Sequence, residues 1–290
     1  NNSLVCQLLL DWGTDLQKIK YLKNLANGEK LGAYSLSEPQ SGSDASNLRT
    51  HAIRENDYYI INGIKNWVTN GINSDLVILF CLTDKSLGSK GISAFIVDKK
   101  MSGISVGKKE DKLGIRASDT CELYFKNCKV PIENRIGEEG IGFQIAMQTL
   151  AGGRIGIAAQ ALGIARAALE SATNYALERK QFGKIIGSFG AIKNKLANMA
   201  TDVDAARLLV WRAAKLKNID EPYIKESSMA KLYASNVAMK AANECVQIYG
   251  GYGYMREYGV ERLMRDAKIT QIYEGTSEIQ QLIISRELMK

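Results

Sequence analysis

Histidine, proline and paired cysteines are scarce in this 290-residue sequence, and each shortage excludes a class of site. His51 is the only histidine, whereas zinc sites and serine or cysteine hydrolases ordinarily need one or more; we interpret it as a solvated strand residue. The five cysteines form no C-x-x-C pair, and an odd number argues against a disulfide framework, so we expect a reducing compartment. No apolar run approaches the roughly 20 residues of a membrane span. We therefore expect no metal site, no disulfide scaffold and no membrane-spanning segment.

The net charge is positive but carries little functional information. The 38 basic and 31 acidic residues give +7, and they are scattered along the chain, which favours anionic small molecules only weakly. Nucleic-acid binding lacks a motif, because neither zinc-finger spacing nor a basic region followed by heptads is present. The absence of G-x-x-x-x-G-K-[ST] removes support for P-loop phosphoryl transfer. Without a basic-then-apolar leader, we expect no signal or transit peptide.

The chain has only three prolines, and the texture of the sequence changes at Pro131. Before it, short β-rich runs alternate with clusters of Gly, Asn, Asp and Ser, which predicts an antiparallel β domain over residues 31–135. The predicted strands are residues 58–61, 76–82, 92–97 and 121–125. After it, a 3.6-residue periodicity predicts a C-terminal four-helix bundle over residues 136–290. The predicted helices are about residues 143–178, 192–213, 224–248 and from Ser277 onward, where Ser277 and Gln280 have capping-box spacing.

Residues 1–30 contain one predicted helix, over residues 16–25, with nothing ahead of it to pack against. We expect this segment to be the remnant of an N-terminal helical domain. The fold class is therefore α+β with several domains: the helical remnant, the antiparallel β domain and the C-terminal four-helix bundle. A doubly wound nucleotide-binding sheet is not expected, because the strands do not alternate with long helices.

Three segments carry residue types suited to chemistry, although each also has a plain structural interpretation. Residues 36–44 (Leu-Ser-Glu-Pro-Gln-Ser-Gly-Ser-Asp) form a loop whose N–H groups can face a ligand, or an ordinary polar turn. Trp67, close to the hydroxyl of Thr69, suits a stacked planar ring, although a core tryptophan is the default. Glu274 follows an apolar stretch and precedes a helix, and a carboxylate in partly apolar surroundings can act as a general base.

Together these segments resemble the acyl-CoA dehydrogenase family, and the similarity extends over essentially all of the sequence. Residues 36–44 are similar to the first signature of the family. Residues 247–257 (Gln-Ile-Tyr-Gly-Gly-Tyr-Gly-Tyr-Met-Arg-Glu), followed by Arg262 and Asp266, fit the second. Residues 1–4, 108–116 and 153–158 are most similar to the short-chain, or butyryl-CoA, branch. The resemblance implies an N-terminal helical domain, most of which is lacking here, a middle β domain and a C-terminal four-helix bundle.

The resemblance also implies FAD as the cofactor and assigns residues to it. The residues lining FAD or lying beside its flavin ring would be Tyr34, Leu36, Ser37, Gly42, Ser43, Trp67, Val68 and Thr69. The residues reaching the FAD of a neighbouring subunit would be Arg179, Phe182, Gln247, Gly250 and Gly251, and Thr276 and Glu278 would touch the cofactor after the catalytic residue. The implied substrate contacts are Ser43, Ala151, Gly152, Gly153, Arg154 and Gly275, although close helix packing also explains the two glycines of the helix.

The reaction implied by the resemblance is α,β-dehydrogenation of a short-chain acyl-CoA to the trans-2-enoyl-CoA, as in fatty acid β-oxidation or butyrate metabolism. Glu274 would remove the α proton, its backbone N–H and a flavin ribityl hydroxyl would hold the thioester carbonyl, and a hydride would pass to flavin N5. Some relatives carry the base at the position of Gly153, which has no carboxylate, so the role falls to Glu274. An electron-transferring flavoprotein would reoxidise the flavin, and the contacts between subunits imply a homotetramer.

Three positions depart from the family pattern. Gly190 stands where relatives usually carry a glutamine on FAD, Asn47 where a smaller residue is usual, and Ala151 where aspartate is frequent. Two alternatives stay open: a truncated, inactive relative that binds flavin, and an acyl-CoA oxidase-like enzyme that passes electrons to oxygen. Similarity to bacterial short-chain enzymes favours the bacterial cytoplasm over the mitochondrial matrix. The sequence does not set the length or branching of the acyl chain.

Overall fold

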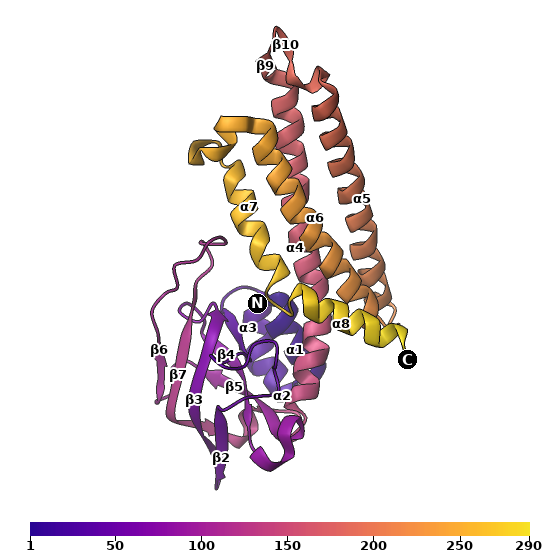
Figure 1. Cartoon of the computed structure of the whole chain (residues 1–290). Coiled ribbons are helices and arrows are strands. Elements are labelled where there is room, and N and C mark those ends of the chain that lie inside the picture. The colour runs from indigo at the N-terminus through magenta and orange to yellow at the C-terminus, as the bar shows by residue number, and fades with distance from the viewer. The chain divides into compact units, whose positions relative to one another are not determined.

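The computed structural model describes all 290 residues, which form two compact units. The β unit comprises Asn1–Lys112 and Arg116–Leu150, and the helical unit comprises Leu113–Ile115 and Ala151–Lys290. One helix, α4 (Gly142–Glu178), begins in the β unit and continues into the helical unit. Figure 1 shows the large sheet and the first short helices in the β unit, and the longer helices with a short two-stranded hairpin in the helical unit.

The β unit is built on one eight-stranded sheet. Its strands are β1 (Gly32–Ser35), β2 (His51–Glu55), β3 (Tyr58–Thr69), β4 (Leu76–Leu82), β5 (Ile92–Asp98), β6 (Ile104–Val106), β7 (Thr120–Pro131) and β8 (Arg135–Ile136). The strand order is β6-β7-β3-β2-β4-β5-β8, with β1 beside β4. Most neighbours are antiparallel, as expected, but β1 and β2 both run parallel to β4, so the sheet is mixed.

Strand β4 lies at the centre of the β unit, because all seven of its residues are buried. Side chains alternate between the two faces of a strand. Val77 and Leu79 therefore face one hydrophobic cluster, with residues of β3 and β7, whereas Ile78 and Phe80 face a second cluster. A strand that is covered on both faces forms a continuous apolar run, which explains why its bounds were predictable from the sequence.

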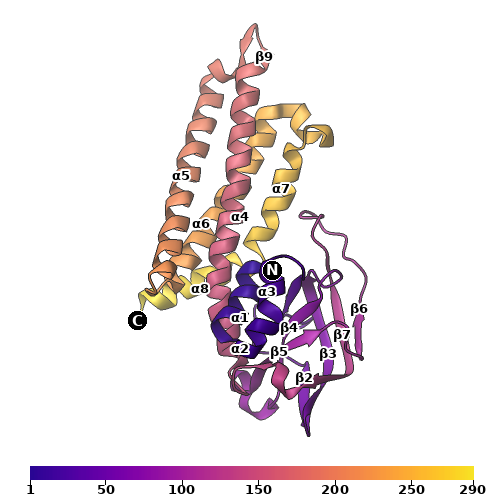
Figure 2. The same ribbon diagram turned by 180° about the vertical axis from the view of Figure 1, so that it is seen from behind.

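A series of short helices at the N-terminus covers one face of the sheet (Figure 2). They are η1 (Asn2–Cys6), α1 (Gln7–Trp12), α2 (Asp15–Gln17), η2 (Lys18–Leu22) and α3 (Lys23–Ala26). Their buried side chains include Leu8, Leu9 and Leu25, which belong to the same cluster as Ile78 and Phe80 of β4. The sequence predicted only the helix over residues 16–25, whereas residues 2–12 are also helical and pack with it. The turns η3 (Lys85–Gly91) and η4 (Ile132–Asn134) complete the unit.

The helical unit has a core lined largely by alanine. Its elements after α4 are β9 (Lys180–Gln181), β10 (Lys184–Ile185), η5 (Ile186–Ser188), α5 (Gly190–Asn218), α6 (Ile224–Tyr249), η6 (Gly250–Tyr254), η7 (Arg256–Tyr258), α7 (Val260–Lys268), η8 (Ile269–Gln271) and α8 (Ser277–Leu288). Buried alanines recur along α4 at steps of three and four, the spacing of one helix face; they are Ala158, Ala161, Ala165, Ala168, Ala172 and Ala176. This small-residue face lets α5 and α6 pack closely against α4.

The predicted fold class, a β domain followed by a C-terminal helical region, is confirmed. Besides the mixed pairing of the sheet, two details of the helical unit differ from the prediction. The polar helix α7 was not predicted. The N-cap of α8 is Thr276, whose side-chain oxygen accepts from the backbone N–H of Ile279, so the predicted cap at Ser277 is wrong by one residue. None of the helices combines the length and the apolar character needed to cross a membrane.

Candidate active site

Glu274 lies in a strained turn between η8 and α8 of the helical unit. Its φ is 52°, and that of Gly275 is 90°. A non-glycine residue in the left-handed region is costly and often marks a functional position. The side-chain amide of Gln280, a buried residue of α8, donates to the carbonyl oxygens of Glu274 (3.3 Å) and Gly275 (2.8 Å). These hydrogen bonds hold the turn that carries the carboxylate.

The carboxyl group of Glu274 is suited to accept a proton. One of its oxygens, Oε2, is buried and has no hydrogen-bond partner. Burial raises the pKa of the Glu274 carboxyl to about 7, although the positive charges of Lys231 and Arg154 oppose the rise. A group that titrates near neutral pH can act efficiently as a general base. The geometry of this turn therefore agrees with the catalytic role that was predicted for Glu274 from the resemblance, which stays a prediction.

Arg154 places a buried positive charge on α4. Its side chain is almost fully buried, Nη1 lies 3.5 Å from Oγ of Ser228, and Nε has no partner. Burial lowers the pKa of the Arg154 guanidinium, while the charge of Glu274 opposes this effect. A guanidinium has five N–H donors and no acceptor. The unused donor can therefore bind an anionic or carbonyl group, as expected for a substrate contact.

The three residues before Arg154 are buried in the same helix. A Cβ atom added to Gly152 would come within 3.0 Å of Nζ of Lys217. Ala151 lies in the core with 3% exposure. Their assignment to the substrate stays a prediction.

Sequence reasoning missed a buried lysine that also holds the turn carrying Glu274. Lys231 of α6 is fully buried, and its Nζ donates to the carbonyl oxygens of Gly275 (2.7 Å) and Thr270 (3.0 Å). Burial lowers the pKa of the Lys231 ammonium to about 8, with the charge of Glu274 opposing. A signal was present in the sequence, because Lys231 lies four residues after Ser227 and three before Ala234, on the helix face that is buried.

Tyr273, next to the candidate base, is also fixed by its surroundings. Its hydroxyl donates to Oε1 of Gln160 on α4. Burial raises the pKa of the Tyr273 phenol, and the negative charge of Glu274 adds to the rise. The tyrosine therefore stays neutral at physiological pH and does not compete with Glu274 as a base.

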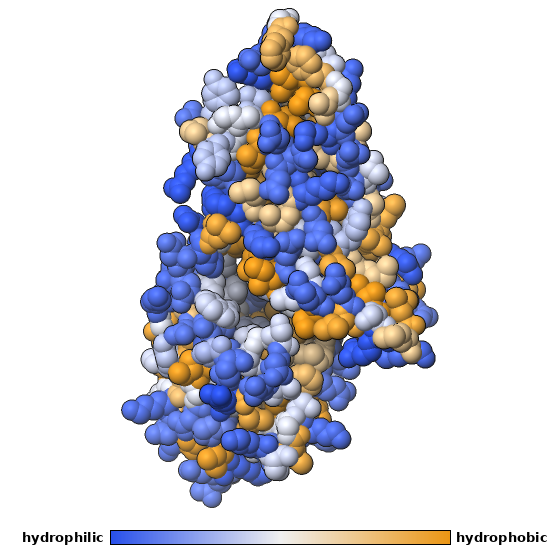
Figure 3. All heavy atoms as spheres, viewed as in Figure 1, coloured by the Kyte–Doolittle hydropathy of each residue, from blue (hydrophilic) through white to orange (hydrophobic).

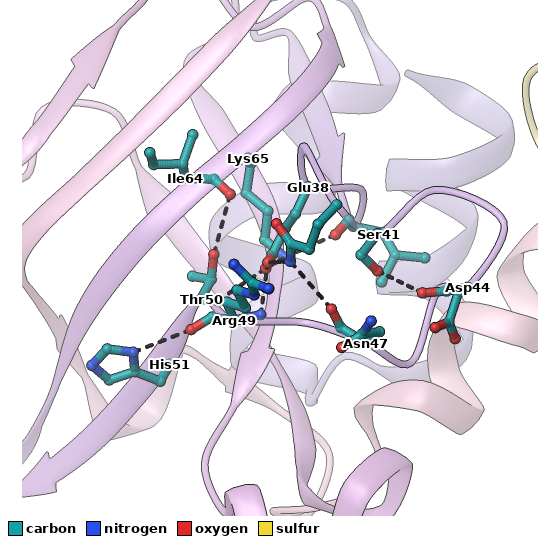
Figure 4. Close-up of polar contacts among 11 residues, drawn as sticks. Glu38, Ser41, Asp44, Asn47, Arg49, Thr50, His51, Ile64 and Lys65 are labelled. Atoms are coloured by element: carbon teal, nitrogen blue, oxygen red, sulfur yellow. Dashed lines mark hydrogen bonds and ion pairs between the residues drawn. The ribbon is translucent and has the colours of Figure 1, made fainter.

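In the β unit, a buried ion pair ties the loop of residues 36–44 to strand β3 (Figure 4). Nζ of Lys65 donates to Oε1 of Glu38 and to the carbonyl oxygen of Leu36, both at 2.8 Å. The carboxylate of Glu38 also accepts from the backbone N–H groups of Arg49 (2.7 Å) and Thr50 (3.1 Å). Burial by itself would raise the pKa of Glu38, but the charge and hydrogen bond of Lys65, with the other donors, hold it below its usual value. These contacts fix the loop of residues 36–44 to strand β3.

Trp67 lies in β3 at an irregularity of the sheet. The pairing of β3 with β7 shifts between Lys65 and Val68, and φ at Trp67 is 59°, as in a bulge that turns a side chain away from the regular direction. Its ring is 63% exposed and available for stacking. The backbone N–H of Asn66 donates to the carbonyl oxygen of Ser37 at 3.0 Å. The structure therefore brings together two of the segments predicted to hold FAD.

The other predicted cofactor residues of the β unit divide into exposed and buried ones. Gly42, Ser43 and Thr69 are exposed, Tyr34 and Ser37 are half-buried, and Leu36 and Val68 are buried. The exposed residues are available to a ligand, whereas the two buried ones support the shape of the site. His51, as interpreted, is an exposed residue of β2 (Figure 4).

A groove of about 400 Å³ in the helical unit contains three of the residues predicted to reach a neighbouring FAD. They are Arg179, Gly250 and Gly251, which lie with Tyr175, Tyr249 and Tyr252. A Cβ atom added to either glycine would meet nothing within 4 Å, so this backbone is open. The remaining predicted residues, Gln247 and Phe182, do not line the groove, although both are exposed.

A second hollow of about 370 Å³ in the helical unit is lined by Thr276 and Glu278, with Asn236, Lys268 and Gln271 among its other residues. Both predicted cofactor residues thus border open space. No group of three or more His, Cys, Asp or Glu side chains could hold a metal ion, and all five cysteines are free.

Comparison with known families accounts for most of the chain. The middle domain of acyl-CoA dehydrogenase matches residues 33–128, and the C-terminal domain of acyl-CoA dehydrogenase matches residues 140–289. The chain belongs to the acyl-CoA dehydrogenase family and is therefore a flavin-dependent oxidoreductase with FAD as its cofactor. The family resemblance seen in the sequence is confirmed.

Similar proteins come from the short-chain branch. The chain is 52% identical to the short-chain specific acyl-CoA dehydrogenase of Clostridium acetobutylicum, over 100% of this chain and 76% of that protein. It is 51% identical to the butyryl-CoA dehydrogenase of Megasphaera elsdenii, with a TM-score of 0.98 over 99% of this chain and 76% of that one. A structure described as the electron transferring flavoprotein of Acidaminococcus fermentans contains a chain with the same identity, TM-score and coverage.

Proposed function

We propose that this chain dehydrogenates a short-chain acyl-CoA thioester to the trans-2-enoyl-CoA and that Glu274 takes the α proton. The observation that carries the proposal is the Glu274 carboxyl, whose Oε2 is buried without a partner, whose turn is strained and whose pKa is raised to about 7. A proton α to a thioester is only weakly acidic, so its removal needs a fixed base of matched pKa. The short-chain class rests on the names of the relatives from Clostridium and Megasphaera.

The residues present fit FAD in both units. In the β unit, the exposed ring of Trp67 and the hydroxyl of Thr69 suit a flavin ring and its polar edge, and Ser37 lies beside them. In the helical unit, Arg179 and the open backbone at Gly250 suit an anionic or aromatic part of a neighbouring FAD. When bound, FAD accepts the hydride that leaves the β carbon of the substrate.

The residues of the chain would then bind the thioester and move one proton. Oε2 of Glu274, which has no partner of its own, would receive the α proton. The backbone N–H of Glu274 would hold the thioester carbonyl, where the developing enolate carries its charge. The unused Nε of Arg154 supplies a further donor for the acyl-CoA. Ser43, Ala151, Gly152, Gly153 and Gly275 complete the substrate contacts that the resemblance implies.

We also propose that the chain forms a homotetramer and passes electrons to an electron-transferring flavoprotein. The groove with Arg179 suits an FAD from another subunit, and hydrophobic side chains gather at the β9–β10 end of the helical unit (Figure 3). The neighbour described as an electron transferring flavoprotein supports the electron acceptor. A location in the bacterial cytoplasm, or in the mitochondrial matrix, stays a prediction.

The experiment that tests the proposal follows the visible absorption of the flavin. The chain is purified with FAD, butyryl-CoA is added without oxygen, and Glu274→Gln is the matched control. Bleaching in the wild type but not in the variant supports the assignment of the base. Retained FAD with no bleaching in either protein would favour the inactive relative, and rapid oxygen consumption with butyryl-CoA would favour the oxidase.

A further inference from the structure

Lys231 is a buried cation without a carboxylate at ion-pair distance. It forms none of the salt bridges of the chain, and its Nζ is bound instead by the carbonyl oxygens of Thr270 and Gly275. A buried charge is expensive unless something in the fold uses it. A methionine or leucine would fill this position on α6, among the buried residues Ser227, Ala230 and Ala234, at lower cost. The lysine therefore calls for an explanation beyond packing.

The charged and titratable groups around Lys231 identify what its charge acts on. Glu274 attracts the ammonium, and Arg154 on α4 repels it. Arg286 on α8 and Tyr223 before α6 act on Arg154. Of the cations that favour the ionised form of Glu274, Lys231 has the largest effect and Arg154 the next. Lys231 is therefore the principal counter-charge of the candidate base.

Resting on the proposed role of Glu274 as the base, we propose that Lys231 is a positioning residue that fixes the Thr270–Gly275 turn and supplies the charge that keeps Glu274 in its proton-accepting form. The two functions share one atom, because Nζ binds both ends of the turn while carrying the charge. Without that charge, the buried carboxyl would hold a proton at neutral pH and could not accept another.

Gln280 provides a matched control within the same turn. Its amide donates to the Gly275 carbonyl at 2.8 Å, close to the 2.7 Å of Lys231, but carries no charge. Gln280→Leu removes a neutral donor from the turn. Lys231→Gln keeps a donor but removes the charge, and Lys231→Met removes both. The three variants together separate the holding of the turn from the charge.

The experiment titrates Glu274 directly in the FAD-loaded full chain. Glutamate labelled with ¹³C at the carboxyl carbon is incorporated, and the Glu274 signal is identified by its loss in Glu274→Gln. Its chemical shift is followed between pH 5 and pH 10, a range that includes the pKa values of both Glu274 and Lys231. The rate of anaerobic flavin bleaching by butyryl-CoA is measured over the same range.

We expect the Glu274 midpoint to rise by about one pH unit in both Lys231→Gln and Lys231→Met, because a nearby positive charge has been removed. The bleaching rate at pH 7 falls accordingly and recovers at higher pH. Gln280→Leu lowers the rate at every pH without moving the midpoint. Lys231→Arg, if it folds, returns the midpoint to that of the wild type.

An unchanged midpoint in both Lys231→Gln and Lys231→Met would overturn the proposal. An equal shift in Gln280→Leu would also overturn it, because the effect would then come from the turn and not from the charge. The ¹³C titration needs no turnover, so it is informative even if Glu274→Gln still bleaches. That last result would refute the proposed function of Glu274 and leave the titration of its carboxyl as a separate measurement.

Discussion

Glu274 illustrates at the residue scale how opposing effects set one titration. Burial raises the pKa of its carboxyl, whereas Lys231 and Arg154 lower it. The effect of burial is the larger one, since the resulting pKa is about 7 instead of the usual 4.5. A fully solvated carboxylate would be too weak a base, and a buried one without cations would stay protonated. The intermediate value is the one that lets a glutamate act as a base near neutral pH.

The same balance predicts a cost in stability. Between pH 4.5 and pH 7 the folded chain keeps a proton on Glu274 that the unfolded chain has lost, so the free energy of unfolding falls as pH rises through this window. Glu274→Gln removes the cost. We expect the variant to be more stable than the wild type by about 1–3 kcal/mol at pH 8 and nearly equal to it at pH 4.5. Urea unfolding at the two pH values checks this.

A Glu274→Gln variant that is less stable than the wild type at pH 8 would contradict this account.

The position of Glu274 in the chain could be predicted from the sequence, because the motif around it is contiguous. The contributions of Lys231 and Lys65 were not accessible, because each contacts residues far along the chain. Lys231 binds a carbonyl 44 residues away and Lys65 a carboxylate 27 residues away. Such contacts exist only once the helices and strands have packed.

At the scale of elements, the β unit depends on how β3 supports the loop of residues 36–44. The ion pair of Lys65 and Glu38 is 0% and 1% exposed, so neither charge can recover its hydration if the other is removed. The pair also fixes the segment that contains Ser37 next to the one that contains Trp67. Its loss should therefore affect both the stability of the unit and the proposed cofactor site.

We expect Lys65→Met to lower the free energy of unfolding by about 3–5 kcal/mol, because it leaves the Glu38 carboxylate buried and unpaired. The double variant Lys65→Met with Glu38→Gln should recover part of this loss. The matched control is Arg166→Met, which breaks an ion pair with Glu170 that is more than half exposed and should change stability by less than about 1 kcal/mol. Urea unfolding and the FAD content after gel filtration are the two measurements. Equal effects of Lys65→Met and Arg166→Met would refute the role of the buried pair.

Most elements were predictable from local periodicity, and the exceptions have physical reasons. The apolar run of β4 and the regular face of α5 correspond closely to the predicted strand and helix. Helix α7 (Val-Glu-Arg-Leu-Met-Arg-Asp-Ala-Lys) buries only Val260 and Ala267, so its hydrophobic pattern is too sparse to identify. Strand β3 extends well beyond the predicted residues 58–61. The prediction ended too early because the later part of the strand buries Lys65 and Asn66, which are polar. Polar residues in the interior mislead a reading based on hydrophobicity.

At the scale of the whole molecule, the exposed hydrophobic side chains of the helical unit favour association between chains. Phe182, between β9 and β10, is 92% exposed. Aromatic side chains are enriched at interfaces between proteins, so this exposed ring is suited to a contact with another subunit. The neighbouring groove with Arg179 and Gly250 has open backbone. The proposed homotetramer explains both features, because one subunit would cover the ring and place its FAD in the groove.

Phe182→Ser should therefore weaken both assembly and cofactor binding. We expect a smaller species in gel filtration with light scattering and an FAD affinity reduced by about tenfold. The matched control is Leu87→Ser, which alters a residue of η3 in the β unit that is 56% exposed. Assembly and FAD affinity that stay unchanged in Phe182→Ser would argue against a subunit interface at this end of the helical unit.

The alanine face of α4 also limits which point mutations the chain can tolerate. A single base change in an alanine codon gives Gly, Ser, Thr, Pro, Val, Asp or Glu. Of these, only Gly and Ser add neither much volume nor a charge nor a break in the helix to a core that is already closely packed. The six buried alanines of this face, from Ala158 to Ala176, are therefore positions where few random point mutations are harmless. Sequence drift along α4 should accumulate on its solvent-facing side and leave this face nearly unchanged.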